Sequence, residues 1–161
     1  MALEIRPATP ADLDDVRFIG FSTWPPTYGP IRGSSFVVKG LDDWWSPQAL
    51  AYSLENGFIF LALDGSTPVG VAEYGFLEQG VVLWKLYVLP SHQGTGVGSR
   101  LLEQVGKIAY GRSSDLITEC EARNERAIAF YSAKGFQQTG RETSKFGDAI
   151  WWRRPHRELD S

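Results

Sequence analysis

The chain opens with a short alternation of apolar and polar residues that predicts a strand. Residues 3–7 have the period of two typical of a half-buried strand, and Pro7 ends the pattern. Residues 9–12 then predict a helix start, because threonine can cap a helix, proline fits the first helical position and an acid suits the first turn. Apolar residues at helical spacing extend this helix to about Phe21.

Residues 22–45 follow neither the strand period nor the helix period. They mix aromatic residues with prolines and glycines, at Trp24, Pro25, Pro26, Tyr28, Pro30, Gly33, Gly40, Trp44 and Trp45. Long structureless loops are uncommon in compact domains, and the aromatic content argues against disorder, so we predict a packed, partly helical loop. Ser46 and Pro47 then start a second helix that extends to about Glu55, and Gly57 ends it.

Three predicted strands, separated by short turns, occupy residues 58–89. Residues 58–63 and 68–77 flank a turn at Asp64-Gly65-Ser66, and residues 81–89 follow a second turn. The third run is almost continuously apolar, which is typical of a central strand buried on both faces of its sheet.

The remaining chain alternates helices and strands. Apolar residues at helical spacing predict a helix from about Val97 to Tyr110, and Asn124 and Gly135 bracket another helix as its cap and its stop. Further strands are predicted at residues 116–121, 136–143 and 149–154. This order of elements favours the α/β class, an α+β arrangement with a mixed sheet.

Length and composition limit the classes of function. A chain of 161 residues and 17.9 kDa suits one domain, which we assign to residues 1–161 with a frayed tail at residues 155–161. The net charge of −3 and the pI near 5.4 argue against a strongly basic nucleic-acid binder, so no nucleic-acid partner is expected. Cys120 is the only cysteine and there are two histidines, so we expect neither an internal disulfide nor a metal site.

The expected location follows from what the sequence lacks. The longest apolar runs are far shorter than the roughly 18 residues of a membrane span. The first residues also lack the charged and then apolar layout of a signal peptide. We therefore expect a cytoplasmic protein with no membrane partner.

The most informative chemistry lies in the turn at residues 93–99. Glycines at positions 94, 96 and 98 let backbone N–H groups approach an anion closely, and the following helix adds its dipole and its unpaired N–H groups. The turn lacks the Lys of a phosphate-binding P-loop, and Ser99 replaces the third glycine of a dinucleotide fingerprint. The turn can therefore hold a phosphate or pyrophosphate without a lysine or a metal ion.

Two motifs together resemble those of a known family. Gln93-x-x-Gly96-x-Gly98 resembles the Gln/Arg-x-x-Gly-x-Gly/Ala signature of the GNAT-type N-acetyltransferase superfamily, and the downstream pattern Asn124-x-x-Ala127-x-x-Phe130-Tyr131-x-x-x-Gly135-Phe136 is similar as well. The resemblance extends over residues 3–154 by order of elements and is specific by motif over residues 81–136. It implies a GNAT-like acyl-CoA N-acyltransferase fold with a splayed central sheet and helices on both faces.

The resemblance also implies how acetyl-coenzyme A binds as co-substrate. The pyrophosphate is expected at the backbone amides of Gln93, Gly94, Thr95, Gly96, Val97, Gly98 and Ser99. The pantetheine arm is expected to pair with the backbone of Leu86, Tyr87 and Val88, which amounts to strand addition at an opened sheet. Asn124 matches the family asparagine that bonds the coenzyme arm, alongside its role as a helix cap.

The catalytic expectations have the same origin. Tyr131 matches the family tyrosine whose hydroxyl can protonate the departing thiolate. The glutamate that deprotonates the amine in some members would stand at position 82, where this chain has Val82. Glu73, an acid in an otherwise apolar strand, is our first choice for the base, followed by Glu119 and Glu121; a solvated strand-face charge is the alternative for each.

The predicted reaction is the transfer of acetyl from acetyl-coenzyme A to a primary amine of a small molecule or peptide. Trp24, Tyr28, Trp44 and Trp45 would form either an aromatic acceptor pocket or part of the core. A non-catalytic sensor of coenzyme A or acyl-coenzyme A on the same fold is the alternative function, and a nucleotide-binding Rossmann module is a third. A homodimer is also expected from the resemblance, without an interface that the sequence specifies.

Overall fold

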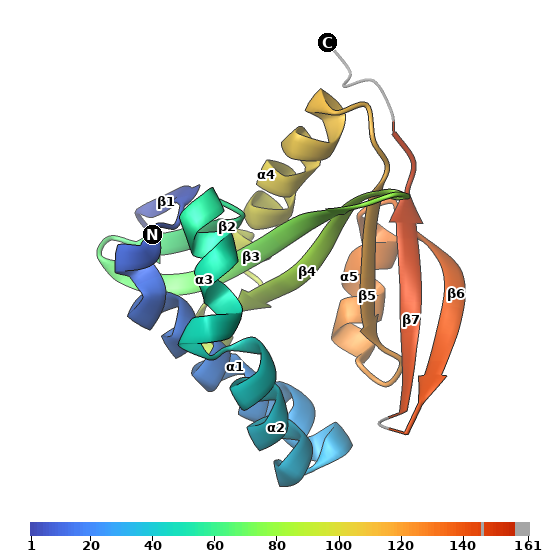
Figure 1. Ribbon diagram of the computed structural model, residues 1–161, viewed down its shortest axis with the longest axis horizontal. Coiled ribbons are helices and arrows are strands. Elements are labelled where there is room, and N and C mark those ends of the chain that lie inside the picture. Colours follow the sequence, from blue (N-terminus) through green and yellow to red (C-terminus); the bar gives the residue numbers. More distant parts are fainter. Residues whose placement is uncertain (146, 157–161) are drawn as a thin grey trace. The chain divides into compact units, whose positions relative to one another are not determined.

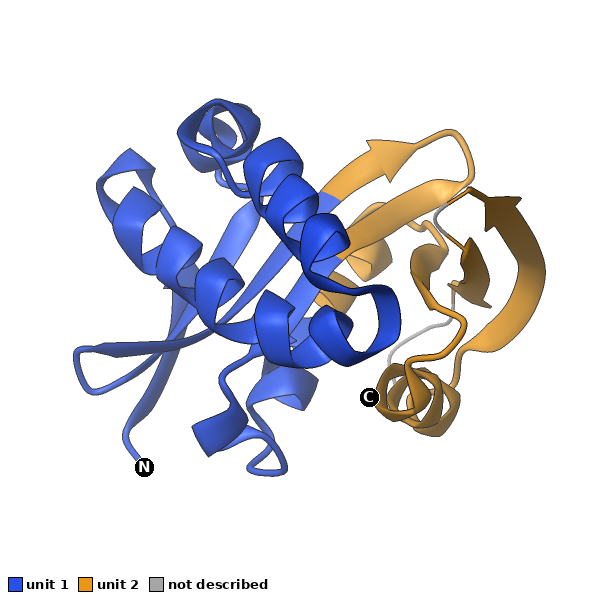
Figure 2. Ribbon diagram, turned by 90° about the horizontal axis from the view of Figure 1, so that it is seen from below, with its two compact units in different colours: residues 1–74, 85–104 blue, residues 75–84, 105–161 orange. Residues whose placement is uncertain are grey.

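The computed structural model describes residues 1–145 and 147–156. The chain divides into two compact units (Figure 2). Unit 1 comprises Met1–Tyr74 and Lys85–Gln104, and unit 2 comprises Gly75–Trp84 and Val105–Ser161.

The elements follow the predicted order, with one extra helix and two short 3-10 helices (Figure 1). The strands are β1 Leu3–Pro7, β2 Ile59–Asp64, β3 Thr67–Leu77, β4 Gly80–Val88, β5 Leu116–Glu121, β6 Gln137–Ser144 and β7 Gly147–Arg154. The helices are η1 Pro10–Asp12, α1 Leu13–Arg32, α2 Ser34–Trp44, α3 Pro47–Asn56, η2 Pro90–His92, α4 Val97–Gly111 and α5 Glu125–Ala133.

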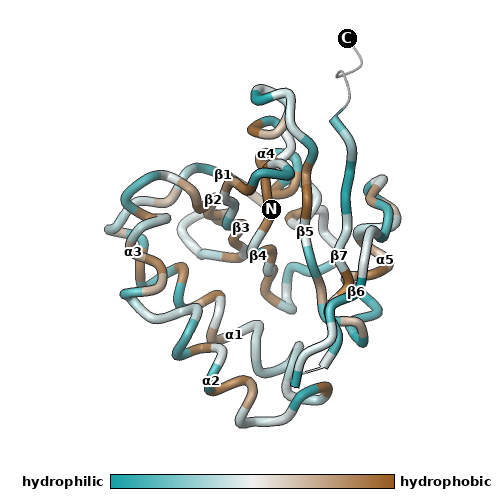
Figure 3. The backbone as a smooth tube through the Cα atoms, turned by 45° about the vertical axis from the view of Figure 1, so that its right-hand side comes forward, coloured by the Kyte–Doolittle hydropathy of each residue, from teal (hydrophilic) through white to brown (hydrophobic). Residues whose placement is uncertain are grey.

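The strands form a mixed sheet, so the predicted fold class is confirmed. In unit 1, β1 pairs antiparallel with β2 and β2 pairs antiparallel with β3, with β4 next in order. In unit 2, β4 pairs parallel with β5, β5 pairs antiparallel with β7, and β6 forms the edge, which Figure 3 colours largely as hydrophilic. The predicted splay of the sheet involves strand segments in different units and stays a prediction.

Helices cover both faces of the sheet in unit 1, as predicted. Leu61 and Val71 lie opposite each other and belong to the core formed with α1, α2 and α3. Gly70, one position away, faces the other side, where a Cβ atom would stand 3.0 Å from Leu101 and 3.3 Å from Val97 of α4. Side chains of a strand alternate between the two faces of a sheet. The apolar residues of β2 and β3 therefore pack against helices on both faces.

Residues 22–45 were predicted as a packed, partly helical loop, and the segment is packed but almost entirely helical. Residues 22–32 continue α1, and α2 follows directly after Gly33. Pro25, Pro26 and Pro30 are exposed, whereas Trp24 on the same helix is 5% exposed. Proline removes a backbone N–H donor from a helix, and local sequence rules therefore disfavour a helix with three prolines. Here the free energy gained by burying the aromatic face of the helix outweighs that cost.

Two glycines make room for the buried indoles. A Cβ atom at Gly20 of α1 would overlap the Trp45 ring, and one at Gly40 of α2 would overlap the Trp24 ring. Neither glycine has a positive φ, so close approach, not backbone conformation, requires them.

Hydrogen bonds to aspartates stabilise the start of the first helical segment and the end of the described chain. Asp12 pairs with Arg6 at 2.8 Å and accepts the N–H of Thr9 at 2.8 Å, and the hydrogen bond from Arg6 lowers the pKa of Asp12 to about 2. Of the tail predicted to be frayed, His156 donates its backbone N–H to Asp115 at 2.7 Å, and residues 157–161 lie outside the described residues.

The glycine that faces Trp24 yields a stability prediction. Gly40→Ala should lower the free energy of unfolding by about 1–3 kcal/mol, because the new methyl group overpacks a filled core. Urea denaturation followed by circular dichroism measures this. The matched control is Gly111→Ala, at an exposed helical glycine with no described atom within 4 Å of its Cβ position. Equal stability of the two variants would contradict the packing described here.

Candidate functional site

The predicted anion-binding turn connects β4 and η2 to α4 in unit 1. Gly94 has φ of 78° and Gly96 has φ of 91°, in the region that favours glycine, while Gly98 lies inside α4. Apart from the adjoining residues, no described atom lies within 4 Å of where a Cβ of Gly94 or Gly96 would stand, so backbone conformation requires these glycines. Both are exposed, and the amides of Val97 to Ser99 begin α4, where a helix has no acceptors of its own for them.

Side chains of the turn bond to the backbone of β4 and η2. The Gln93 side chain donates to the carbonyl of Val88 at 3.1 Å, and the Thr95 hydroxyl donates to the carbonyl of His92. The motif glutamine therefore holds the turn against the end of β4. The same bond occupies one of the β4 backbone groups expected to pair with pantetheine.

The middle of β4 carries two polar side chains toward α1 and α2. The Tyr87 hydroxyl hydrogen-bonds the Tyr28 hydroxyl at 2.9 Å, and the Tyr87 ring packs against Trp45 with centroids 5.5 Å apart. Lys85, two positions earlier, places its Nζ 5.2 Å from the Trp45 ring centroid. Leu86, Tyr87 and Val88 are all half-buried.

Glu73 is a buried, paired carboxylate. It is 7% exposed and lies opposite Ile59, on the sheet face that α1, α2 and α3 cover. Its Oε1 lies 2.6 Å from Nζ of Lys85. The alternative for this residue, a solvated charge on the strand face, does not fit this burial.

The aromatic residues of segment 22–45 divide into a buried group and a more exposed group. Trp45 is fully buried and Trp24 nearly so, whereas Trp44 is 48% exposed. Trp24 packs against Tyr28 with centroids 4.5 Å apart and against Trp44 at 5.5 Å. The indole N–H groups of Trp24 and Trp45 have no hydrogen-bond partner among the described residues. Trp24 and Trp45 are therefore core residues, and Trp44 and Tyr28 lie at the edge of this core.

In unit 2, the predicted cap is confirmed. The Asn124 side chain accepts the N–H of Ala127 at 3.1 Å at the start of α5. Tyr131 on the same helix is buried, with its ring 5.3 Å from Phe136 and 6.2 Å from Trp152 between centroids. The aromatic body of Tyr131 thus packs in the core of unit 2.

The carboxylates of β5 differ from Glu73 in their surroundings. Glu119 lies opposite Trp151 in the sheet, and the Trp151 indole donates to Glu142 at 3.1 Å. Glu119 is an exposed residue, but the protein around its carboxylate partly desolvates it and raises its pKa, and the negative charge of Glu142 adds to the rise. Among the described residues no hydrogen bond or ion pair holds Glu119, whereas Glu121 pairs with Arg123 at 3.3 Å.

The surroundings of Val82 and Cys120 bear on which groups can react. Val82 is fully buried, so the position of the family glutamate lies in the core. The Trp152 indole donates to the Cys120 sulfur at 3.3 Å, and burial raises the pKa of this thiol, which disfavours the nucleophilic thiolate. No cluster of metal-ligating residues occurs in the described part of the chain, and none of its helices is long and apolar enough to cross a membrane.

Sequence reasoning did not find the partner of Glu73. Glu73 and Lys85 each stand six residues from Gln79, the middle residue of the turn that the sequence predicts at residues 78–80. Counting outward from that turn would have brought the two side chains together, because hairpin register follows from the turn.

Comparisons with known proteins agree with the fold. The model of the acetyltransferase (GNAT) family matches residues 20–136. The chain is 24% identical over 156 residues to a spermidine N(1)-acetyltransferase of Thermoplasma acidophilum, covering 91% of this chain and 95% of that protein. It is 31% identical over 155 residues to an aminoglycoside N(6')-acetyltransferase type 1 of Stenotrophomonas maltophilia, covering 85% and 88%.

A solved structure supports the same assignment. The PaiA N-acetyltransferase of Thermoplasma acidophilum in complex with coenzyme A superposes with a TM-score of 0.84, at 22% identity, covering 97% of this chain and all of that one. The family match spans more than half of the chain and includes the glycine turn, β5 and α5. The chain therefore belongs to the acetyltransferase (GNAT) family and is an acyltransferase that uses acetyl-coenzyme A.

Proposed function

We propose that the protein transfers acetyl from acetyl-coenzyme A directly to a primary amine of a small molecule. The observation that carries this proposal is the turn at residues 93–99, with two exposed positive-φ glycines immediately before a 15-residue helix. Backbone amides presented in this way bind phosphate groups without a cationic side chain. In unit 1, residues 93–99 bind the pyrophosphate and residues 86–88 accompany the pantetheine arm.

Asn124 and Tyr131, at the start and in the body of α5, are the further coenzyme and catalytic groups of this proposal. Asn124 bonds the coenzyme arm while it caps α5, and Tyr131 protonates the leaving sulfur. The amine nitrogen attacks the thioester carbonyl carbon, the carbon–sulfur bond breaks, and the thiolate takes the proton of the Tyr131 hydroxyl. The amine gives up its proton to a carboxylate, and an amide and free coenzyme A are the products.

Two carboxylates compete for the role of base. Glu73 would have to give up its contact with Lys85 at 2.6 Å before it accepts a proton. Glu119 has no such partner among the described residues, and its raised pKa makes it the better proton acceptor near neutral pH. We therefore favour Glu119, with Glu73 as the alternative that the experiment below distinguishes.

The acceptor is proposed to be a polyamine-like cation. Spermidine and aminoglycosides, named for two relatives, both carry several amino groups. The like-charged pair Glu119 and Glu142 beside Trp151, together with the net charge of −3, favours such a cation over an anionic acceptor. A peptide amine is the second acceptor class, and we propose a cytoplasmic location because both classes of amine occur there.

Membership in the acetyltransferase family argues against the alternative of a non-catalytic sensor of acyl-coenzyme A. Val82, which leaves the family position for a base without an acid, is the observation that favours this alternative. Release of free thiol in the presence of an amine would exclude the sensor.

Coenzyme binding tests the turn. Gly96→Glu should weaken acetyl-coenzyme A binding at least about tenfold in isothermal titration calorimetry, because it strains a backbone with φ of 91° and adds a negative charge at the phosphate site. Gly111→Glu adds the same charge at an exposed glycine of the helical end and should bind like the parent. Equal affinity of Gly96→Glu and the parent would remove the turn assignment.

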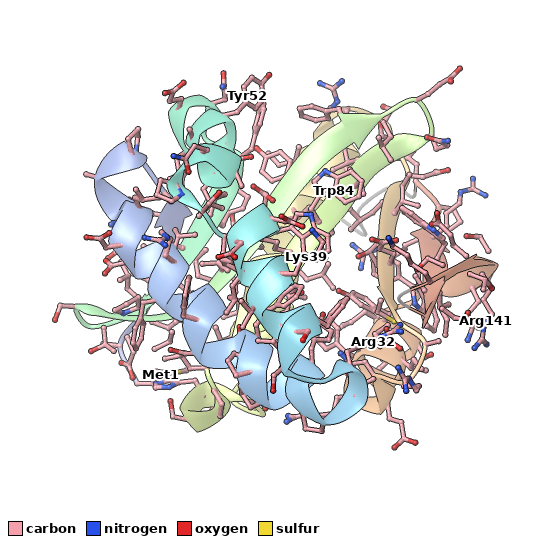
Figure 4. All side chains as sticks on the ribbon, turned by 60° about the horizontal axis from the view of Figure 1, so that its bottom comes forward. Met1, Arg32, Lys39, Tyr52, Trp84 and Arg141 are labelled. Carbon is pink, nitrogen blue, oxygen red and sulfur yellow. The ribbon has the colours of Figure 1, made fainter. Side chains whose placement is uncertain are left out.

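Turnover tests the acid and the base. Tyr131→Phe and Glu119→Gln should each lower kcat about 100-fold or more, in the range expected for loss of a general acid or base. Thiol release with spermidine measures this, and Tyr52→Phe, at an exposed tyrosine on α3 labelled in Figure 4, is the matched control. Glu73→Gln should have a smaller effect. The reverse order of the two glutamate variants would assign the base to Glu73.

The pH profile tests the environment of Glu119. A base works deprotonated, so activity falls as pH drops through its pKa, and the raised pKa places that fall above the ordinary glutamate value of about 4.3. Glu142→Gln removes a negative charge, lowers the pKa of Glu119 and should move the acid limb of kcat/KM to lower pH. Glu78→Gln, at an exposed glutamate, should leave the limb in place. A limb unaffected by Glu142→Gln would contradict the proposed base.

A further inference from the structure

A contact between His92 and Asp64 joins the start of the proposed coenzyme-binding turn at residues 93–99, called the coenzyme turn below, to the β2–β3 hairpin. Asp64 ends β2, and His92 ends η2, just before the glycines. His92 Nε2 lies 2.9 Å from Asp64 Oδ2 across 28 residues of sequence. The two side chains are 21% and 30% exposed. The pair belongs entirely to unit 1.

Both ends of this contact have further partners. Asp64 Oδ1 accepts the N–H of Ala2 at 3.1 Å, and Gly65 donates its N–H to the Ala2 carbonyl at 2.9 Å, so the hairpin is also tied to the start of β1. His92 Nδ1 lies 2.8 Å from the Ser91 hydroxyl. With both ring nitrogens engaged inside the protein, the imidazole holds an orientation instead of offering a group to a ligand.

The backbone of His92 carries the connection into the turn. Its N–H donates to the Leu89 carbonyl at 2.9 Å, and its carbonyl accepts the Thr95 hydroxyl. The next glycines have no described atom within 4 Å of their Cβ positions. The turn therefore gains little order from packing around Gly94 and Gly96, and depends on hydrogen bonds at its base.

We propose that Asp64 and His92 are positioning residues for the coenzyme turn, which hold the backbone amides at residues 93–99 in place without touching the coenzyme. This rests on the proposed binding of acetyl-coenzyme A at that turn. Preorganised amides bind an anion more tightly because less conformational freedom is lost on binding. Loss of the contact should therefore weaken coenzyme binding and leave the chemical step unchanged.

Titration calorimetry and steady-state kinetics test the pair. His92→Ala and Asp64→Ala should each raise the Kd and the KM for acetyl-coenzyme A about three- to tenfold, in keeping with the loss of one partly exposed charge-assisted hydrogen bond. The kcat at saturating acetyl-coenzyme A and the KM of the amine should stay within about twofold of the parent. The double variant should bind no more weakly than the weaker single variant, because both changes remove one shared contact.

Two controls separate positioning from general destabilisation. Asp43→Ala breaks another ion pair of unit 1, that of Asp43 with Lys39 at 2.9 Å on α2, where Figure 4 labels Lys39, and should leave acetyl-coenzyme A binding unchanged. His92→Gln retains an N–H donor at a similar reach and should recover part of the lost affinity. Additive effects of the two alanine variants, or parental affinity in both, would overturn the proposal.

Hydrogen exchange tests the same idea without coenzyme. The backbone amides of residues 93–96 should exchange faster in His92→Ala and in Asp64→Ala than in the parent and in Asp43→Ala. If the parent does not bind acetyl-coenzyme A, the proposed function fails, and exchange still decides the positioning role. If the parent binds and Gly96→Glu does not, unchanged exchange and affinity in the His92 and Asp64 variants overturn the positioning role alone.

Discussion

Burial of two indole rings is the constraint on which unit 1 depends. Trp24 and Trp45 fill the space between α1, α2 and the sheet, and Gly40 and Gly20 allow the helices to approach these rings. Dense packing of this kind leaves few alternatives for neighbouring side chains. The Trp45 ring thereby sets the surroundings of Lys85 and Tyr87 on β4, so the core also places polar groups on the strand that leads to the coenzyme turn.

Glu73 in unit 1 and Glu119 in unit 2 have opposite electrostatic surroundings. In unit 1, Glu73 is compensated by Lys85, which offsets the desolvation cost of a buried carboxylate. In unit 2, partial burial and then the negative charge of Glu142 raise the pKa of Glu119, so its ionised form is disfavoured. The raised pKa of Glu119 favours proton uptake, and a carboxylate without a cationic partner also attracts cations. Glu73 and Glu119 are both acids on strands and are similar candidates for the base by sequence alone. Their electrostatic surroundings distinguish them.

Particular residues show how far the sequence could be interpreted. Periodicity identified the strands, and residue type identified the Asn124 cap and the left-handed Gly57, because these signals are local. The helical course of residues 22–32 was missed because its cause is the burial of Trp24 against distant elements, which local rules on proline do not include. The Lys85 partner of Glu73 and the Tyr28–Tyr87 hydroxyl pair depend on tertiary contacts in the same way.

The glycine motif illustrates a more general separation between binding atoms and the groups that order them. A motif identifies backbone amides that can bind a phosphate, because glycine at positive φ is a local requirement. Those same glycines increase the freedom of the unbound turn and would by themselves weaken binding. Order must come from other contacts, and here Gln93 at Val88 and His92 at Asp64 connect the turn to β4 and to the β2–β3 hairpin. The affinity of such a turn is consequently a property of the strands around it as much as of the motif.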